Sequence, residues 1–193
     1  MIHLIRVGLG YEVFKRVFGI RPKFPKPPML GNEITMPGQN SELHNGFVNC
    51  ANNNVGLRAT FHRIDSDGVG CRWINQQSGL EGYPGMIHGG ISAALLDELM
   101  TNTVFHSIGK FGVTYKGTFS WHKPLPAGSE VTGKGEVVYK SKDFIRARAC
   151  LFRKDGKVFV SSDAVFYIPT QQEFQKMAEL ASVPQDLHRH FKG

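Results

Sequence analysis

The stretch "GMIHGGISAALLDELM", residues 85–100, indicates one long buried helix. Its apolar residues do not alternate with polar ones, and the run is long enough for a helix rather than a strand. Two features are unusual: the stretch opens on a His-Gly-Gly run and carries an Asp-Glu pair inside its apolar part. Glycine is the poorest ordinary helix former, and carboxylates are rarely buried without a partner. These residues are therefore candidates for chemistry as well as for packing.

The two glycines, Gly89 and Gly90, lie where the helix is expected to begin. A helix N-terminus presents unpaired backbone N–H groups and the positive end of the helix dipole. Without side chains, the glycines let a ligand oxygen approach that backbone closely. A carbonyl placed there would be polarised, and the oxyanion formed on attack would be stabilised. His88 stands directly before them, where it can orient the site or donate a hydrogen bond.

The acids, Asp97 and Glu98, offer a general base for water or a nucleophile. Together with the glycines they supply the parts needed to transfer an acyl group to water. The alternative is purely structural: a tight turn made by the glycines, and a buried acid satisfied by its neighbours. The string leaves both interpretations open, and it does not choose between the two acids.

Alternating apolar and polar residues predict strands on both sides of this helix. Before it, the pattern covers "LRATFHRI" and "VGCRWI"; after it, the pattern covers "GVTYKGTFSWHK", "SEVTGKGEVVYK", "DFIRARACLFRK" and "KVFVSSDAVFYIP". Asp155-Gly156 is a hairpin turn signal between the last two. A final helix is expected over residues 170–181, capped by Thr170. One long helix against one antiparallel sheet is an α+β arrangement.

Composition narrows the class of protein. The chain has 193 residues, a net charge of +7 and an apolar share of 41%, which suits one domain with an appended segment. The excess of positive charge is compatible with an acidic partner, such as a phosphorylated small molecule or anionic lipid, and the alternative is that most of these charges form a solvated surface. Nucleic acid is not expected, because no zinc-finger spacing, RNP-type motif or basic helical stripe occurs. The 3 cysteines are widely spaced, which favours a reducing compartment.

Residues 1–31 form a separate segment in this interpretation. The segment is basic and poor in acids, its apolar residues fall near helical spacing, and it ends in a run rich in proline. Such a start is typical of a mitochondrial presequence, although it lacks serine. A helix on a membrane surface and a plain helix docked on the domain are the alternatives. We therefore expect a mitochondrial protein, with a cytoplasmic one as the alternative.

Other chemistries lack their motifs. There is no G-x-S-x-G elbow, no dinucleotide fingerprint, no phosphate-binding loop of the Walker type and no H-E-x-x-H zinc motif. His188 and His190, near the C-terminus, are expected to belong to a solvated tail rather than to a metal site. We expect neither a metal nor a cofactor.

Three motifs in order resemble the hotdog-fold acyl-CoA thioesterases of the PaaI-like thioesterase superfamily. The first is "CANNNVGLRATF", with Asn54 where the family usually has proline; the second is the His-Gly-Gly run, followed by a carboxylate nine positions after the His. The third is "GVTYKGTFSWHKPLPAGSEV", which resembles the family's Thr-bearing strand and its Lys-Pro-Leu-Pro loop. The resemblance covers roughly residues 50–168. It implies an antiparallel sheet wrapped around one long helix, and two such units paired through a continuous sheet.

The resemblance also implies roles for individual residues. Asp97 would be the catalytic carboxylate, the Gly89 N–H would polarise the thioester carbonyl, His88 would support it, and Thr114 would help to place the water. Substrate contacts would come from Gly90, from Lys123 in the Lys-Pro-Leu-Pro loop, and from Lys142, near the coenzyme A phosphates. Asp143 follows Lys142 where another basic residue is expected.

The resulting hypothesis is a hotdog thioesterase domain over residues 32–170, followed by a C-terminal helix and tail over residues 171–193. It would hydrolyse fatty acyl-CoA to fatty acid and coenzyme A as a homodimer, with a tetramer as the alternative. A non-catalytic hotdog protein that binds acyl-CoA or docks on a membrane is the alternative function. Gly89 and Asp97 are eight residues apart on one helix, or about 12 Å along its axis, so both can reach one carbonyl only from different chains.

Overall fold

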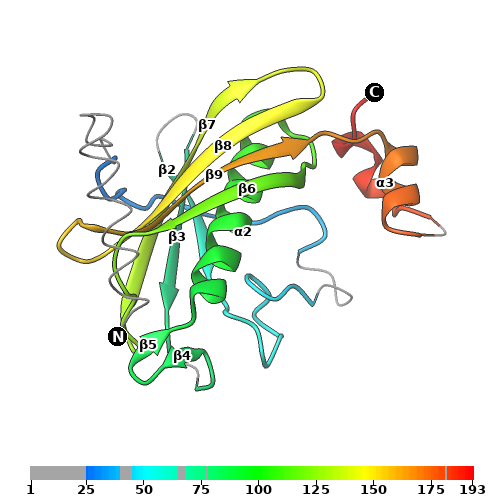
Figure 1. Cartoon of the computed structure of the whole chain (residues 1–193). Coiled ribbons are helices and arrows are strands. Elements are labelled where there is room, and N and C mark those ends of the chain that lie inside the picture. Colours follow the sequence, from blue (N-terminus) through cyan, green and yellow to red (C-terminus); the bar gives the residue numbers. More distant parts are fainter. Residues whose placement is uncertain (1–24, 40–44, 65–67, 77, 181) are drawn as a thin grey trace.

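The computed structural model describes residues 25–39, 45–64, 68–76, 78–180 and 182–193. A seven-stranded antiparallel sheet curves around one long helix, α2 (Gly89–Ile108), as Figure 1 shows. This arrangement confirms the predicted α+β hotdog architecture. Of the predicted N-terminal segment 1–31, residues 1–24 lie outside the described residues, and the domain boundary at residue 32 stays a prediction.

The sheet contains seven strands in the order β1-β2-β3-β7-β8-β9-β6. Their bounds are β1 (Glu33–Ile34), β2 (Thr60–Ile64), β3 (Gly68–Ile74), β6 (Val113–Trp121), β7 (Glu130–Lys140), β8 (Phe144–Phe152) and β9 (Val158–Tyr167). All the pairings between neighbours are antiparallel. The two edges differ greatly in length, because β1 has 2 residues and β6 has 9.

The helix begins where the sequence predicts but is longer than expected. Residues 86–87 form a short strand, β5 (Met86–Ile87), which pairs with β4 (Glu81–Tyr83), and the helix begins at Gly89. It then continues past residue 100 to Ile108, and Gly109 ends it in the left-handed conformation (φ 69°) that glycine adopts without strain.

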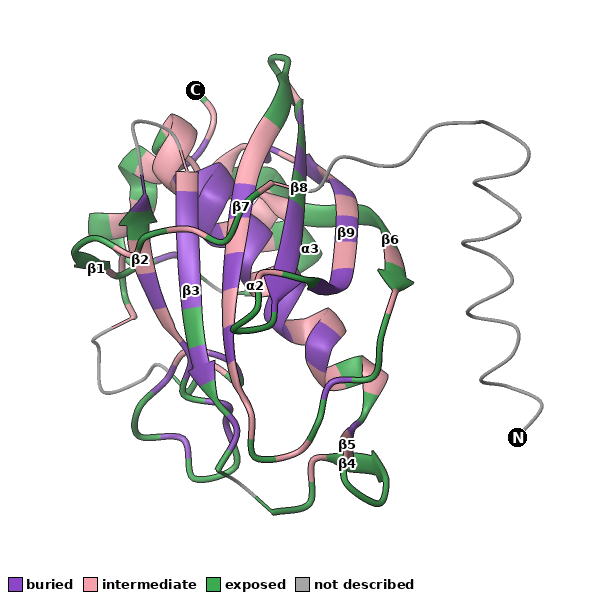
Figure 2. Cartoon of the chain, turned by 90° about the vertical axis from the view of Figure 1, so that its left-hand side faces the viewer, coloured by how far each residue is buried: buried purple, intermediate pink, exposed green. Residues whose placement is uncertain are grey.

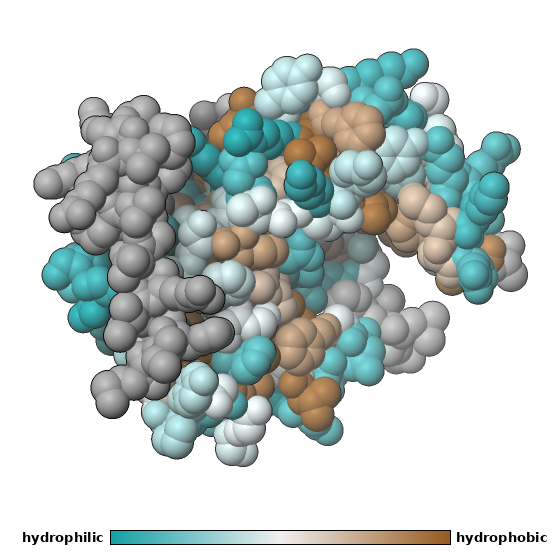
Figure 3. Space-filling view, in the orientation of Figure 1, coloured by the Kyte–Doolittle hydropathy of each residue, from teal (hydrophilic) through white to brown (hydrophobic). Residues whose placement is uncertain are grey.

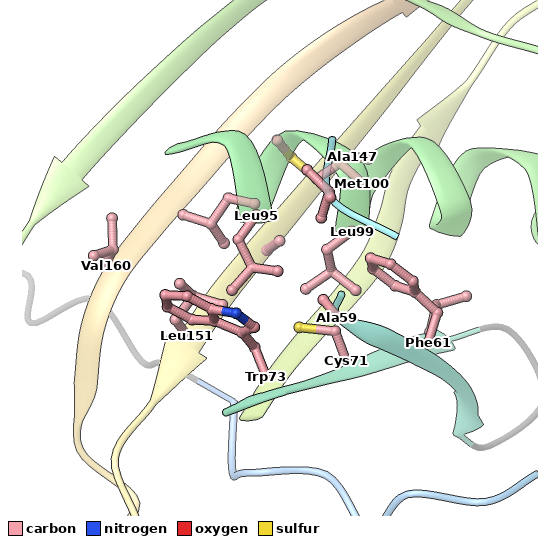
Figure 4. Close-up of a cluster of buried hydrophobic side chains, with 14 of the residues drawn as sticks. Ala59, Phe61, Cys71, Trp73, Leu95, Leu99, Met100, Ala147, Leu151 and Val160 are labelled. Carbon is pink, nitrogen blue, oxygen red and sulfur yellow. The ribbon is translucent and has the colours of Figure 1, made fainter. Parts of the chain in front are cut away.

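The core lies between α2 and the inner face of the sheet (Figures 2 and 4). Strand β8 shows the period of two: Ile145, Ala147, Ala149 and Leu151 are buried, whereas the alternating Arg146 and Arg148 are exposed. The side chains of Leu95 and Leu99 project from the helix toward Trp73 and Cys71 on β3. Full burial of a side chain of this size is worth about 1.5–3 kcal/mol. Gly133 on β7 lets the helix approach, since a Cβ there would lie 2.8 Å from Leu99.

The expected solvated tail is only partly found: His188 is exposed, whereas His190 is half-buried against the end of α2 and Phe191 is buried. Helix α3 (Gln171–Met177) is shorter than predicted, but Thr170 caps it with Glu173 as the sequence indicates. A 3₁₀ turn, η1 (Gln185–His190), follows, and the His190 ring bonds to the carbonyl of Gly109 at 2.9 Å. A tilted ring contact between Phe105 and His190, with centroids 5.1 Å apart, helps to hold this segment.

Residues 30–32 join the proline-rich segment to the sheet. The Gly31 N–H donates to the Arg63 carbonyl, and the Arg63 N–H donates to the Asn32 carbonyl, both at 2.9 Å. Leu30 is half-buried and lies near Gly70 on β3. Among the described residues, no helix is long and apolar enough to span a bilayer.

Candidate active site

Asp97 and Thr114 lie together where α2 meets the edge strand β6. The Thr114 hydroxyl donates to the Asp97 carboxylate, with 2.8 Å between Oγ1 and Oδ1. Asp97 is half-buried and Thr114 is exposed. The structure therefore brings two of the predicted catalytic residues into direct contact.

A β-bulge at Tyr115 makes this contact possible. The pairing between β6 and β9 shifts between Thr114 and Lys116, which leaves Tyr115 as an extra residue in the edge strand. In an unbroken strand, Thr114 would face away from α2, opposite to Phe119 and Trp121, because faces alternate at every residue. The bulge turns Thr114 back toward the helix and leaves Tyr115, expected as a regular member of the alternation, 72% exposed.

The environment of Asp97 raises the pKa of its carboxyl group above the ordinary value of 3.8. Burial is the main cause, because it disfavours the charged form, and the hydrogen bond from Thr114 opposes it by favouring the carboxylate. No cation forms an ion pair with Asp97 within the residues described. A carboxylate of raised basicity beside a hydroxyl is suited to take a proton from water.

Glu98, the second acid of the pair, is held by amides instead. Its Oε1 accepts from Asn49 Nδ2 at 2.7 Å and from Asn102 Nδ2 at 3.2 Å. The bond from Asn49 ties α2 to the segment before β2, whereas the bond from Asn102 lies within α2, and both are structural. Of the two acids that the sequence left open, Asp97 is the one that faces the edge strand.

The N-terminus of α2 holds the other half of the candidate site. The His88 side chain caps the helix, since its Nδ1 accepts from the Gly90 N–H at 2.9 Å. In the neutral ring the proton is therefore on Nε2. The amide of Gly90 is committed to this cap, whereas the Gly89 N–H has no hydrogen-bond partner among the described residues. Gly89 is thus the glycine whose backbone donor is available.

Residues that the sequence did not single out complete this end. The Trp121 indole donates to Ser92 Oγ at 3.1 Å, and the Ser92 hydroxyl donates to the Gly89 carbonyl at 2.8 Å. Trp121 was expected only as a strand residue, and Ser92 only as part of the helix. The sequence offered one signal for this contact, which is the polar Ser92 three positions after Gly89.

The two halves of the site are separate within one chain. Gly89 and Asp97 lie on one unbroken helix, eight residues or about 12 Å apart along its axis. Strand β6 spans both halves, because Thr114 near its start contacts Asp97 and Trp121 at its end contacts Ser92. One chain therefore does not bring the predicted donor and the predicted base to the same carbonyl.

The two candidate lysines lie at opposite ends of the sheet. Lys123 follows the end of β6, and Lys142 lies in the turn between β7 and β8, beside the start of β6 (Figure 1). Both are exposed. Asp143, which stands where the resemblance led us to expect a basic residue, accepts a hydrogen bond from Lys192 at 2.6 Å, so a neighbouring cation balances its charge.

Strand β6 leaves one side of the site open. It is exposed along most of its length (Figure 2), and apolar residues gather among polar ones over this part of the molecule (Figure 3). Tyr115 and Trp121 are 72% and 40% exposed. Within the described part of the chain, no cluster of histidine, cysteine or acidic side chains is arranged to hold a metal ion.

Comparison with known proteins supports this fold. Residues 84–160 match the family model of the thioesterase superfamily. No curated protein matches the chain.

Three of the solved structures that are similar to this chain illustrate the likeness. A thioesterase superfamily protein is 19% identical, with a TM-score of 0.60, and the match covers 84% of this chain and 89% of that one. A thioesterase from Haemophilus influenzae is 16% identical over 61% and 83% of the two chains, with a TM-score of 0.54. A hypothetical thioesterase from Streptococcus pneumoniae, solved with coenzyme A, is 21% identical over 56% and 84%, with a TM-score of 0.51.

At these identities the solved structures show the fold alone. The matched residues 84–160 contain α2, β6, β7 and β8, and with them both halves of the candidate site. Residues 84–160 thus resemble the thioesterase superfamily, and the chain has the hotdog fold of these thioesterase-superfamily structures.

Proposed function

We propose that this protein hydrolyses fatty acyl-CoA thioesters to free fatty acid and coenzyme A. The match of residues 84–160 to the thioesterase superfamily supports hydrolysis of a thioester in general. The observation that carries the proposal is Asp97: a half-buried carboxylate of raised pKa, bonded to Thr114 beside an open strand edge. The Streptococcus pneumoniae relative contains coenzyme A, which supports an acyl-CoA as the substrate.

The reaction follows from the groups present. The Gly89 N–H would donate to the thioester oxygen, and the positive end of α2 would stabilise the oxyanion that forms. Asp97 would remove a proton from water as the water oxygen bonds to the carbonyl carbon. When the tetrahedral intermediate collapses, the C–S bond breaks. The sulfur of coenzyme A leaves with the proton that Asp97 took from water. The products are a carboxylic acid and a thiol, and no redox step is required.

Two chains are needed for this mechanism, and β6 supports a way to pair them. A two-fold axis at Thr118 would place Thr114 of one chain opposite Trp121 of the partner in an antiparallel pair, because the bulged Tyr115 is not counted in the register. Asp97 beside Thr114 would then lie near the partner's Gly89 beside Trp121. Each dimer would contain two such composite sites, and a tetramer of two dimers is the further alternative.

The positive charge fits the substrate. Coenzyme A carries a pyrophosphate and a 3′-phosphate, and the chain has a net charge of +7. In the paired arrangement, Lys142 at the Thr114 end of one chain would approach the partner's Lys123 at its Trp121 end. We propose these lysines as phosphate contacts. The basic residues 1–24 are proposed to direct the protein to mitochondria or to a membrane surface.

The experiment is a thiol-release assay on the full chain with a panel of acyl-CoAs of increasing length. Release above background that Asp97→Asn abolishes supports the proposal. Tight binding of acyl-CoA by calorimetry, with no release at any chain length, would favour the non-catalytic binding protein instead.

A further inference from the structure

A two-step hydrogen-bond relay links the edge strand to the first turn of α2. Trp121 Nε1 donates to Ser92 Oγ, 3.1 Å away, and Ser92 Oγ donates to the carbonyl oxygen of Gly89, 2.8 Å away. Ser92 is 2% exposed, so water does not compete strongly for its hydroxyl. The relay therefore fixes the Gly89 carbonyl from the side of β6.

The indole ring also packs directly on Gly89. A Cβ built on Gly89 would lie 3.1 Å from Trp121 Nε1 and 3.4 Å from Cε2. A side chain here would require the indole to shift by a few tenths of an ångström, which gives a packing reason for glycine at this position. The ring thus covers one side of the residue whose N–H is the available donor.

The peptide groups on both sides of Gly89 are held. In the peptide that joins Gly89 to Gly90, Ser92 binds the carbonyl, and His88 Nδ1 accepts from the N–H. In the peptide that joins His88 to Gly89, the carbonyl accepts from the Ile91 N–H at 3.0 Å. The Gly89 N–H is therefore fixed in direction while it stays unpaired among the described residues.

This support matters because two glycines begin the helix. Glycine costs roughly 1 kcal/mol relative to alanine within a helix, so a Gly-Gly first turn tends to fray. Oxyanion stabilisation requires a donor that is already oriented before the charge forms. A first turn that samples other conformations loses part of that benefit.

We propose that Trp121 is a positioning residue that acts through Ser92 to hold the Gly89 N–H in its productive direction. The proposal rests on the proposed thioester hydrolysis for its kinetic part only. It gives β6 a second task, since the same strand orients Asp97 through Thr114 and Gly89 through Trp121.

The kinetic test removes each hydrogen bond separately. Trp121→Phe keeps an aromatic ring but loses the N–H, and Ser92→Ala loses the hydroxyl. We expect each to lower kcat about fivefold to tenfold with KM changed less than threefold, as for one lost hydrogen bond. Because both residues act in one relay, the kcat of the double variant should be no lower than that of the less active single variant.

Trp73→Phe is the matched control. It removes the same kind of bond, from the indole of Trp73 to the Leu57 carbonyl at 3.0 Å, in the buried core away from both halves of the site. We expect a lower Tm and an unchanged kcat. A Trp121→Phe enzyme whose kcat stays within twofold of the wild type, or whose loss lies entirely in KM, would overturn the proposal.

A measurement that does not need activity separates this proposal from the proposed function. Amide hydrogen exchange at Gly90 and Ile91, both bonded to His88, reports opening of the first turn. We expect several-fold faster exchange there in Trp121→Phe and Ser92→Ala, and no change in Trp73→Phe. Unchanged exchange would overturn the relay even in an active enzyme. Faster exchange in a protein that releases no thiol would support the relay while the proposed hydrolysis fails.

Discussion

Two adjacent acids on α2 lie in different environments on different faces of the helix. Asp97 and Glu98 follow each other in sequence and project about 100° apart around the helix. Glu98 faces the segment before β2 and accepts from two amides, whereas Asp97 faces the edge strand and accepts from one hydroxyl. An acid supplied with amide donors is held in place as part of the fold. An acid that is half-buried with one weak donor keeps its basicity and remains available for chemistry.

The largest expected effect on activity, and the first test of this comparison, comes from replacing each acid with its amide. Asp97→Asn preserves shape and can still accept from Thr114, but it cannot take a proton. We expect kcat to fall by about 10²–10⁴-fold, as is typical for loss of a general base. Glu98→Gln, the matched control, should keep activity within about threefold, because its oxygen can still accept from Asn49. The reverse pattern in a thiol-release assay would move the catalytic role to Glu98.

A smaller effect is expected at Thr114. Its hydrogen bond lowers the pKa of Asp97, so Thr114→Val should raise that pKa further. Asp97 acts as a carboxylate, so activity falls as pH falls through its pKa, and this acidic limb should move to higher pH in the variant. We expect roughly tenfold lower kcat/KM on that limb and a smaller loss at alkaline pH, measured as a pH–rate profile.

Thr118→Val provides the control on the same strand, because Thr118 lies on the face of β6 opposite to Phe119. Its profile should match that of the wild type. If Thr114→Val leaves the acidic limb in place, or moves it to lower pH, the bond to Asp97 does not tune the base.

Much of this arrangement follows from sequence, but the bulge does not. The period of two in β8 and the apolar run of α2 each predict their element, because burial of one face produces the pattern. Tyr115 was assigned to a regular alternation with Val113, since an inserted residue leaves no signature in a strand of mixed aromatic and polar residues. The sequence therefore indicated Thr114 by resemblance, while the geometry that turns it toward Asp97 came from the pairing register with β9.

The hydrogen-bond relay from Trp121 through Ser92 to Gly89 also could not be predicted from the sequence. Trp121 is far from Ser92 along the chain, and only the return of β6 along α2 brings them together. The sequence also does not indicate β5, just before α2, because its two residues are too few to give a periodic signal. In the C-terminal part, the sequence predicts solvated His188 and His190, and it gives no sign of the contact between His190 and Phe105.

A moderate effect on stability is expected from truncation. A chain that begins at residue 25 retains the contacts of residues 30–32 with β2 and should keep its Tm and its activity. A chain that begins at Asn32 loses the bond from Gly31 to Arg63 and the packing of Leu30. We expect its Tm to fall by roughly 2–4 °C for each kcal/mol lost, while kcat is unchanged. Thermal melts of the two truncated chains check this, and a loss of folding on removal of residues 1–24 would contradict it.

The smallest effect concerns the cost of keeping Asp97 charged. Its pKa in the folded state lies above the ordinary value of 3.8, so folding binds a proton more tightly. Its contribution to stability is therefore present below that value and is lost as pH rises through the folded pKa. At neutral pH the carboxylate opposes folding, and Asp97→Asn should unfold at a slightly higher temperature than the wild type. This difference should vanish in melts at acidic pH, and a less stable variant at neutral pH would contradict the raised pKa.

Our central claim is that Asp97 of one chain and Gly89 of the partner chain act on the same thioester carbonyl. Gly89→Pro removes the donor N–H, and the backbone suits it, since His88 already has the extended ψ of 135° that a residue before proline prefers. Gly89→Ala is its control, because it adds a similar Cβ against Trp121 but keeps the N–H.

The most direct measurement mixes Gly89→Pro with Asp97→Asn, unfolds and refolds them together, and assays thiol release. Each variant alone should be nearly inactive. Random pairing makes half of the dimers mixed, and each mixed dimer has one intact site and one doubly damaged site, so about one quarter of wild-type activity should return. If mixed dimers are demonstrated by mass and no activity returns, the account of a site shared between two chains is wrong.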